Sequence, residues 1–143
     1  MITRARTELA ALTFVVALVA LAGCAGGKKV ALEPTQAVAA AKGNVRAERT
    51  DSGNTRLDVQ VQHLAPPGKV VPGAQVYVVW AQRDDASAPQ NLGALAVGGD
   101  RKGKLETLTP LDRFEVFLTP EQVPAAAEPT SEPVMRSRVE TPP

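Results

Sequence analysis

The chain has 143 residues, with 16 lysines and arginines against 15 aspartates and glutamates, one histidine and one cysteine. This length is enough for one domain with one core. The near balance of charge excludes the strongly basic surface that nucleic acid requires, and a single cysteine excludes a disulfide framework.

Residues 1–23 have the pattern of a secretory signal peptide. Arg4 and Arg6 precede the apolar segment Leu9–Ala22, which ends in small residues. A membrane-spanning helix needs about 20 apolar residues, so this shorter segment predicts export and removal. Its loss leaves 120 residues with 14 basic and 14 acidic side chains, because Arg4, Arg6 and Glu8 leave with it. Such a balanced mature chain offers no polybasic patch for anionic lipid.

The residues Leu21-Ala22-Gly23-Cys24 at the end of this segment resemble the lipobox of bacterial lipoproteins. The resemblance implies cleavage between Gly23 and Cys24 and attachment of lipid to Cys24. Members of that family typically carry two or three acyl chains, and these hold a protein far more firmly than one chain. Ala25, where aspartate would retain the protein, implies the outer membrane if the organism has two membranes. We therefore expect a lipid anchor on the extracytoplasmic side of the bacterial cell envelope.

Residues 24–42 are expected to be the lipidated N-terminus and a flexible linker. Ala25–Lys29 is small and polar, and the alanine-rich run Ala37–Ala41 lacks an apolar stripe. A different pattern begins at Gly43. We therefore place the boundary of the folded domain there and its end at residue 140.

Residues 43–140 carry the pattern of an all-β domain. Around Leu57–Val61, apolar and polar residues alternate, which predicts a half-buried strand; the turn Asp51–Asn54 joins it to a partner at Asn44–Thr50. The apolar run Gln75–Gln82 predicts a central strand covered on both faces. About seven short strands without a convincing helix predict an antiparallel immunoglobulin-like β-sandwich, with Trp80 in its core. The remaining strands are expected at 91–97, 103–108, 113–119 and 134–140.

Several short motifs in this region follow one another at the spacing of a known family. They are Tyr77-Val78-Val79-Trp80, Asn91-Leu92-Gly93, Gly103 with Leu105, Phe114–Thr119 with Glu121, Pro129-Thr130 and Pro133-Val134. Over roughly residues 74–139 they resemble the C-terminal extracytoplasmic domain of anti-sigma-K factors. That family adds a transmembrane helix and a cytoplasmic domain that binds a sigma factor, whereas here a lipobox stands in place of the helix. The resemblance implies a fold and not anti-sigma activity.

The single histidine is the first candidate for catalysis. His63 with Asp58 or Asp51 and a serine such as Ser52 or Ser87 would supply the residue types of a catalytic triad. No nucleophile signature such as Gly-x-Ser-x-Gly accompanies them. We therefore interpret His63 as a surface residue at the end of a strand and predict no enzymatic activity.

Metal and anion sites are the next candidates. Asp84-Asp85, or Asp51 with Asn54, offer oxygen ligands for calcium, but without the ligand spacing of a known site. The glycine-rich and basic segment Gly98–Lys104 has the composition of an anion-binding turn and equally that of a hairpin turn. We predict a turn at 98–100, no metal site and no cofactor.

The sequence favours a non-enzymatic interaction or sensory module that contacts another envelope protein. Strand alternation leaves either Phe114 or Phe117 on the outer face, where a second sheet covers it or a partner binds it. The alternative is a small-ligand or ion-binding lipoprotein. An interaction module should have an exposed apolar patch, whereas a ligand-binding protein should have a concave apolar pocket with a few convergent polar groups.

Overall fold

Eight strands make up about half of the described part of the chain, residues 27–142 of the computed structural model. A 3₁₀ turn, η1 (Gln36–Val38), and a single helical turn, α1 (Pro67–Val70), lie between strands. The strands are β1 Lys28–Pro34, β2 Lys42–Arg49, β3 Thr55–Gln62, β4 Val76–Gln82, β5 Gln90–Leu95, β6 Gly103–Thr109, β7 Arg113–Glu121 and β8 Met135–Glu140.

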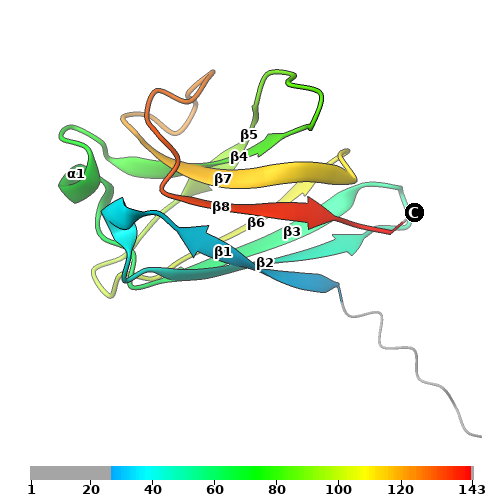
Figure 1. Cartoon of the computed structure of the whole chain (residues 1–143), viewed down its shortest axis with the longest axis horizontal. Helices are drawn as coiled ribbons and strands as arrows, with labels where there is room; N and C mark the ends of the chain where they lie inside the picture. The colour runs from blue at the N-terminus through cyan, green and yellow to red at the C-terminus, as the bar shows by residue number, and fades with distance from the viewer. Residues whose placement is uncertain (1–26, 143) are drawn as a thin grey trace, which may run out of the picture.

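All eight strands form one antiparallel sheet in the order β5-β4-β7-β8-β1-β2-β3-β6. β1 joins the two halves, because its first five residues pair with β2 and its last two with β8. The sheet curls until its edge strands meet, where Thr107 Oγ1 on β6 donates a hydrogen bond of 2.9 Å to Leu92 O on β5. The result is a nearly closed barrel (Figure 1). The prediction of an all-β antiparallel fold is confirmed.

One apolar core fills the interior of the barrel. On β3, the inward residues Leu57, Val59 and Val61 are buried and alternate with more exposed polar residues, as the sequence pattern predicts. β4 contributes Tyr77 and Val79 to the same core. Removing such side chains from water is the main source of stability for a domain of this size.

β1 and η1 lie in the segment that was expected to be a flexible linker, so that expectation is corrected for residues 28–38. Their apolar signal is short, since only Leu32 and Val38 are fully buried here and Val30 is half-buried. β1 is fixed by backbone pairing with β2 and β8, which a local sequence pattern does not reveal. β1 is also the strand that raises the number from about seven to eight.

The strands run between two ends of the barrel, which we call the near end and the far end. Figure 1 shows the start of β1 and the C-terminus together at the near end, and α1 at the far end. The strand pairing also places three turns at the near end, residues 50–54, 83–89 and 110–112. The far end carries residues 63–75, 96–102 and 122–134.

A second, smaller apolar cluster lies on the outer face of β4 and β7. Its members Val78, Trp80 and Phe117 are buried, and Ala126 packs against them. Ala126 belongs to residues 122–134, which we call the strap. The burial of Trp80 is confirmed, but the side chain lies in this outer cluster and not among the residues of the main core. Phe117 is only 4% exposed, because the strap covers it. It is therefore neither covered by a second sheet nor free to contact a partner.

Candidate functional site

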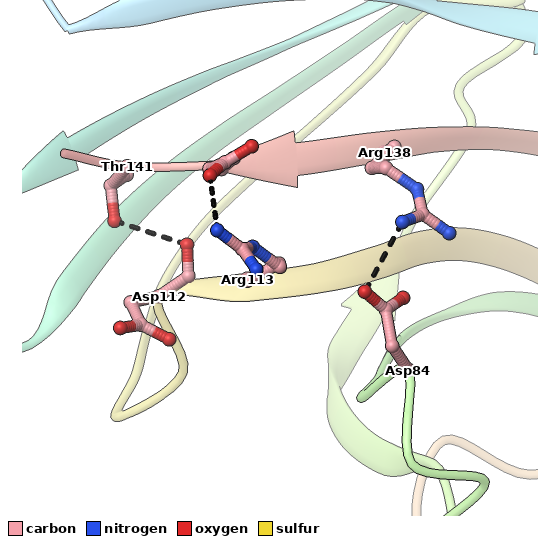
Figure 2. A network of polar contacts seen from close by, with 6 residues as sticks. Asp84, Asp112, Arg113, Arg138 and Thr141 are labelled. Atoms are coloured by element: carbon pink, nitrogen blue, oxygen red, sulfur yellow. Dashed lines mark hydrogen bonds and ion pairs between the residues drawn. The ribbon is translucent and has the colours of Figure 1, made fainter.

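A polar groove lies at the near end of the barrel. It has a volume of about 580 Å³ and is bordered by the loop after β4, the turn before β7 and the end of β8. Two ion pairs lie at its edge: Arg113 Nη2 donates to Glu140 Oε1 at 2.6 Å, and Arg138 Nη1 to Asp84 Oδ2 at 3.1 Å. Figure 2 shows Arg138 and Asp84 pointing toward each other, with Arg113 nearby. The lining residues are Arg83, Asp84, Asp85, Pro110, Leu111, Asp112, Arg113, Glu140, Thr141 and Pro142.

Side chains of both positive and negative charge line this groove. Arg83 Nε lies 3.4 Å from Asp85 Oδ2. The Ser87 hydroxyl and N–H donate hydrogen bonds that lower the pKa of Asp85 below its ordinary value, and the hydrogen bond to Glu140 raises the pKa of Arg113. The Asp85 carboxylate and the Arg113 guanidinium therefore stay charged at neutral pH. An ionic ligand would have to compete with a carboxylate or a guanidinium that is already in place.

The structure separates the residues that we considered for a catalytic triad. His63 is exposed after the end of β3, at the far end, in a left-handed backbone conformation with φ 56°. Asp51 and Ser52 precede β3, and Ser87 follows β4, so all three lie at the near end. Eight strand residues at about 3.4 Å each separate the two ends by roughly 25 Å. These residues therefore do not share a site.

Of the candidate calcium ligands, the two adjacent carboxylates Asp84 and Asp85 are engaged by other protein groups. Asp84 and Asp85 pair with arginines, as described above, and Asn54 donates to Ser52 Oγ at 3.3 Å within its own turn. Within residues 27–142, no three histidine, cysteine, aspartate or glutamate side chains are grouped to hold a metal ion.

The segment Gly98–Lys104 forms the tight connection between β5 and β6. Three of its backbone donors are used within the turn: Gly98 N–H donates to Lys102 O, Arg101 N–H to Gly98 O and Lys102 N–H to the Asp100 carboxylate. The acidic side chain of Asp100 thus occupies the place an anion would take. The segment is a hairpin-type turn whose amides serve the fold.

A polar network that the sequence analysis did not single out fastens the strap. Trp80 Nε1 donates to Thr119 Oγ1 at 2.8 Å, and Thr119 Oγ1 donates to Glu121 Oε1 at 2.6 Å. Thr130 on the strap donates to the same carboxylate through both its N–H and its hydroxyl. Glu121 is only 2% exposed, yet these donors satisfy both of its oxygens.

Asn91 on β5 fastens the other part of the strap. Its Nδ2 donates to Pro124 O at 3.0 Å and to Ala126 O at 2.9 Å, while its Oδ1 accepts from Gly93 N–H. The strap is thus held by hydrogen bonds to two separate strands. The one sequence signal for this arrangement was the set of motifs of the anti-sigma-K resemblance, which contains Asn91, Glu121 and Thr130.

Comparison with known proteins adds no relative. No model of a known protein family matches the chain, and no curated protein matches it either. Among residues 27–142, none of the helices has the length and apolar character needed to cross a membrane. Gly23 and Cys24, the residues of the expected cleavage and lipidation, lie outside the described residues.

Proposed function

We propose that this protein is a lipoprotein of the bacterial cell envelope, cleaved after Gly23 and anchored through lipid on Cys24. The observation that carries the proposal is the apolar segment Leu9–Ala22 closing in Leu21-Ala22-Gly23-Cys24. The cysteine is the only one in the chain, so no other thiol competes for the role. Ala25 favours the outer membrane in an organism with two membranes.

The barrel domain acts by contact with another envelope protein and not by chemistry. What supports this is the dispersal of reactive groups: His63 lies at the far end, while the near-end arginines Arg83 and Arg113 are paired with carboxylates. The large exposed apolar side chains among the described residues, Leu108 and Val123, are 56% and 55% exposed. They lie at opposite ends of the barrel and do not form the exposed apolar patch expected of an interaction module, so the contact uses polar surface.

We further propose that the domain is an immunoglobulin-like β-sandwich related to the extracytoplasmic domain of anti-sigma-K factors. Two observations support the relation. β1 pairs first with β2 and then with β8, as a strand does when it passes between the two layers of a sandwich. The motif residues Trp80, Asn91, Glu121 and Thr130 all serve one purpose, the attachment of the strap.

The near-end groove favours a second candidate, the binding of a small polar ligand or an ion. Its volume of about 580 Å³ would hold a small molecule, although its walls are charged and not apolar. Titration calorimetry with small dicarboxylates and inorganic phosphate tests this candidate. Saturable heat that disappears in Arg113→Ala would support the ligand-binding function.

The anchor is tested by replacing its attachment atom. Cys24→Ser should abolish incorporation of labelled fatty acid and leave an uncleaved precursor, because serine has no thiol to acylate. Gly23→Ala is the matched control, since alanine is also small and should be processed normally. Acylation of Cys24→Ser to the normal extent would refute the anchor.

The contact function is tested by complementation of a deletion strain. His63→Ala, Asp84→Ala and Asp85→Ala should restore any phenotype that the wild-type gene restores, because contact does not require these groups. Loss of complementation by a stably folded His63→Ala variant would instead indicate a ligand or catalytic site around His63.

A further inference from the structure

The chain is part of the folded domain from Gly27 onward. A Cβ atom added to Gly27 would lie 2.6 Å from Ala47 O and 2.9 Å from Glu48 Cβ, distances that no side chain tolerates. The ladder with β2 begins at the next residue, where Lys28 pairs with Ala47. The backbone at residue 27 is thus packed directly against the end of β2.

This packing leaves a very short connection to the proposed anchor. Only Ala25 and Gly26 separate Cys24 from Gly27. Three steps between consecutive Cα atoms span at most roughly 11 Å, whereas a flexible linker over residues 24–42 would have reached roughly 60 Å. A lipid on the Cys24 thiol holds that residue at the level of the lipid glycerol groups, so the domain starts no more than roughly 11 Å from that level.

We propose that the near end of the barrel lies against the polar headgroups of the membrane and that the far end points away from it. This orientation rests on the proposed lipidation of Cys24. The surface in contact consists of exposed turns, namely Asp51–Gly53, Arg83–Ser87 and Pro110–Asp112. The far-end loops stand roughly 25 Å farther out, the length of an eight-residue strand, where a second protein can reach them.

The tether, and not electrostatic attraction, holds this surface to the membrane. Arg83 and Arg113 are paired with Asp85 and Glu140, so the near end presents charges of both signs. Such a surface gains little from anionic lipid, because attraction of its cations is offset by repulsion of its carboxylates. The orientation should therefore be the same on neutral and anionic membranes.

The orientation is tested with fluorescent labels on the lipidated full-length protein. Ser52→Cys places a thiol at the near end and Lys69→Cys places one at the far end; both positions are exposed. The thioether to lipid blocks Cys24, so each variant has one reactive thiol. The proteins are reconstituted into phosphatidylcholine vesicles, with or without phosphatidylglycerol, that contain a lipid with a nitroxide on its headgroup.

The nitroxide should quench the label at position 52 several-fold more strongly than the label at position 69, on both kinds of vesicle. Insertion of about 15 glycine and serine residues after Ala25 should remove the difference, because such a linker has a typical reach of roughly 20 Å. Equal quenching at the two positions in protein that floats with the vesicles would overturn the orientation alone. Protein that carries no lipid and does not float would overturn the anchor as well.

Discussion

The outer face of the barrel differs sharply between its two halves. On β2, β3 and β6 it is charged and open to water: Arg46 lies beside Asp58, which lies beside Glu106 on the next strand. Lys104 Nζ adds contacts of 2.8 Å to Glu106 and 3.6 Å to Asp58. Exposed pairs of this kind contribute little stability, since both partners are well solvated when apart.

On β4 and β7 the outer face is apolar and covered. Val78, Trp80 and Phe117 are buried beneath the strap, which Glu121 and Asn91 hold in place. The difference between the two outer faces matches the difference between their strand sequences. Strict alternation indicates a strand with one wet face, whereas a continuous apolar run indicates that something covers both faces. Here that cover is a proline-rich segment and not a second sheet.

The largest expected effect comes from removing the centre of the covered face. Trp80→Ala should lower the free energy of unfolding by about 3–5 kcal/mol, because it leaves a cavity under the strap and removes the donor to the buried Thr119 hydroxyl. Leu108→Ala, on the charged face, should change it by less than about 0.5 kcal/mol. Urea denaturation followed by circular dichroism measures both. Similar losses for the two variants would show that the faces do not differ as described.

A smaller effect is expected from the carboxylate that fastens the strap. Glu121→Ala should cost about 2–3 kcal/mol, because it leaves the buried Thr119 hydroxyl and the part-buried donors of Thr130 without an acceptor. The matched control is Glu115→Ala, which removes a half-exposed glutamate from the same face of β7 and should cost less than about 1 kcal/mol. Hydrogen exchange should rise at strap amides such as that of Thr130 in the first variant only. Unchanged exchange there would contradict the role of Glu121.

Tyr77, on the inner face of β4, should make the free energy of unfolding depend on pH. Burial raises the pKa of Tyr77 from 10.0 to about 12, and its hydroxyl donates to Ala65 O. The folded state therefore holds the phenolic proton more tightly than the unfolded state, so this stabilisation is complete below pH 10 and is lost as the pH rises toward 12. The stability advantage of wild type over Tyr77→Phe should shrink across that interval in denaturation experiments. A constant difference up to pH 12 would show that Tyr77 is not buried.

The smallest effect on stability is expected from a substitution on the charged outer face of β2, β3 and β6. Lys104→Met removes the contacts to Glu106 and Asp58, which raise the pKa of this exposed lysine. Because water and salt screen these contacts, the melting temperature should fall only slightly at low ionic strength and not at all in about 1 M salt. A large fall that persists in high salt would mean that the face is held together by more than solvated ion pairs.

Local patterns were sufficient for much of the barrel. The alternation around Leu57–Val61 and the apolar run of β4 correctly predict where those strands lie and which faces are buried. β1 could not be predicted, because Leu32 is its one fully buried side chain and its pairing involves residues far along the chain. The burial of Glu121 also depends on distant residues, since a glutamate alone is expected in water until Thr130 is placed beside it.

The near-end groove shows the same dependence on distant residues. Arg113 and Glu140 are far apart in the sequence and meet only because β7 and β8 pair in register. The proposal that Cys24 is lipidated, by contrast, rests on its immediate neighbours alone, since a lipobox is a linear motif. The anchor is thus the part of the proposed function that the sequence carries by itself.

The intact mass of the protein purified from bacterial membranes tests the central claim most directly. We predict a chain that begins at Cys24, lacks residues 1–23 and carries the added mass of a diacylglyceryl group on the thiol, with or without a further acyl chain on the new N-terminus. Fragmentation should place that mass on the first residue. A chain that retains residues 1–23, or an unmodified Cys24, would contradict the account.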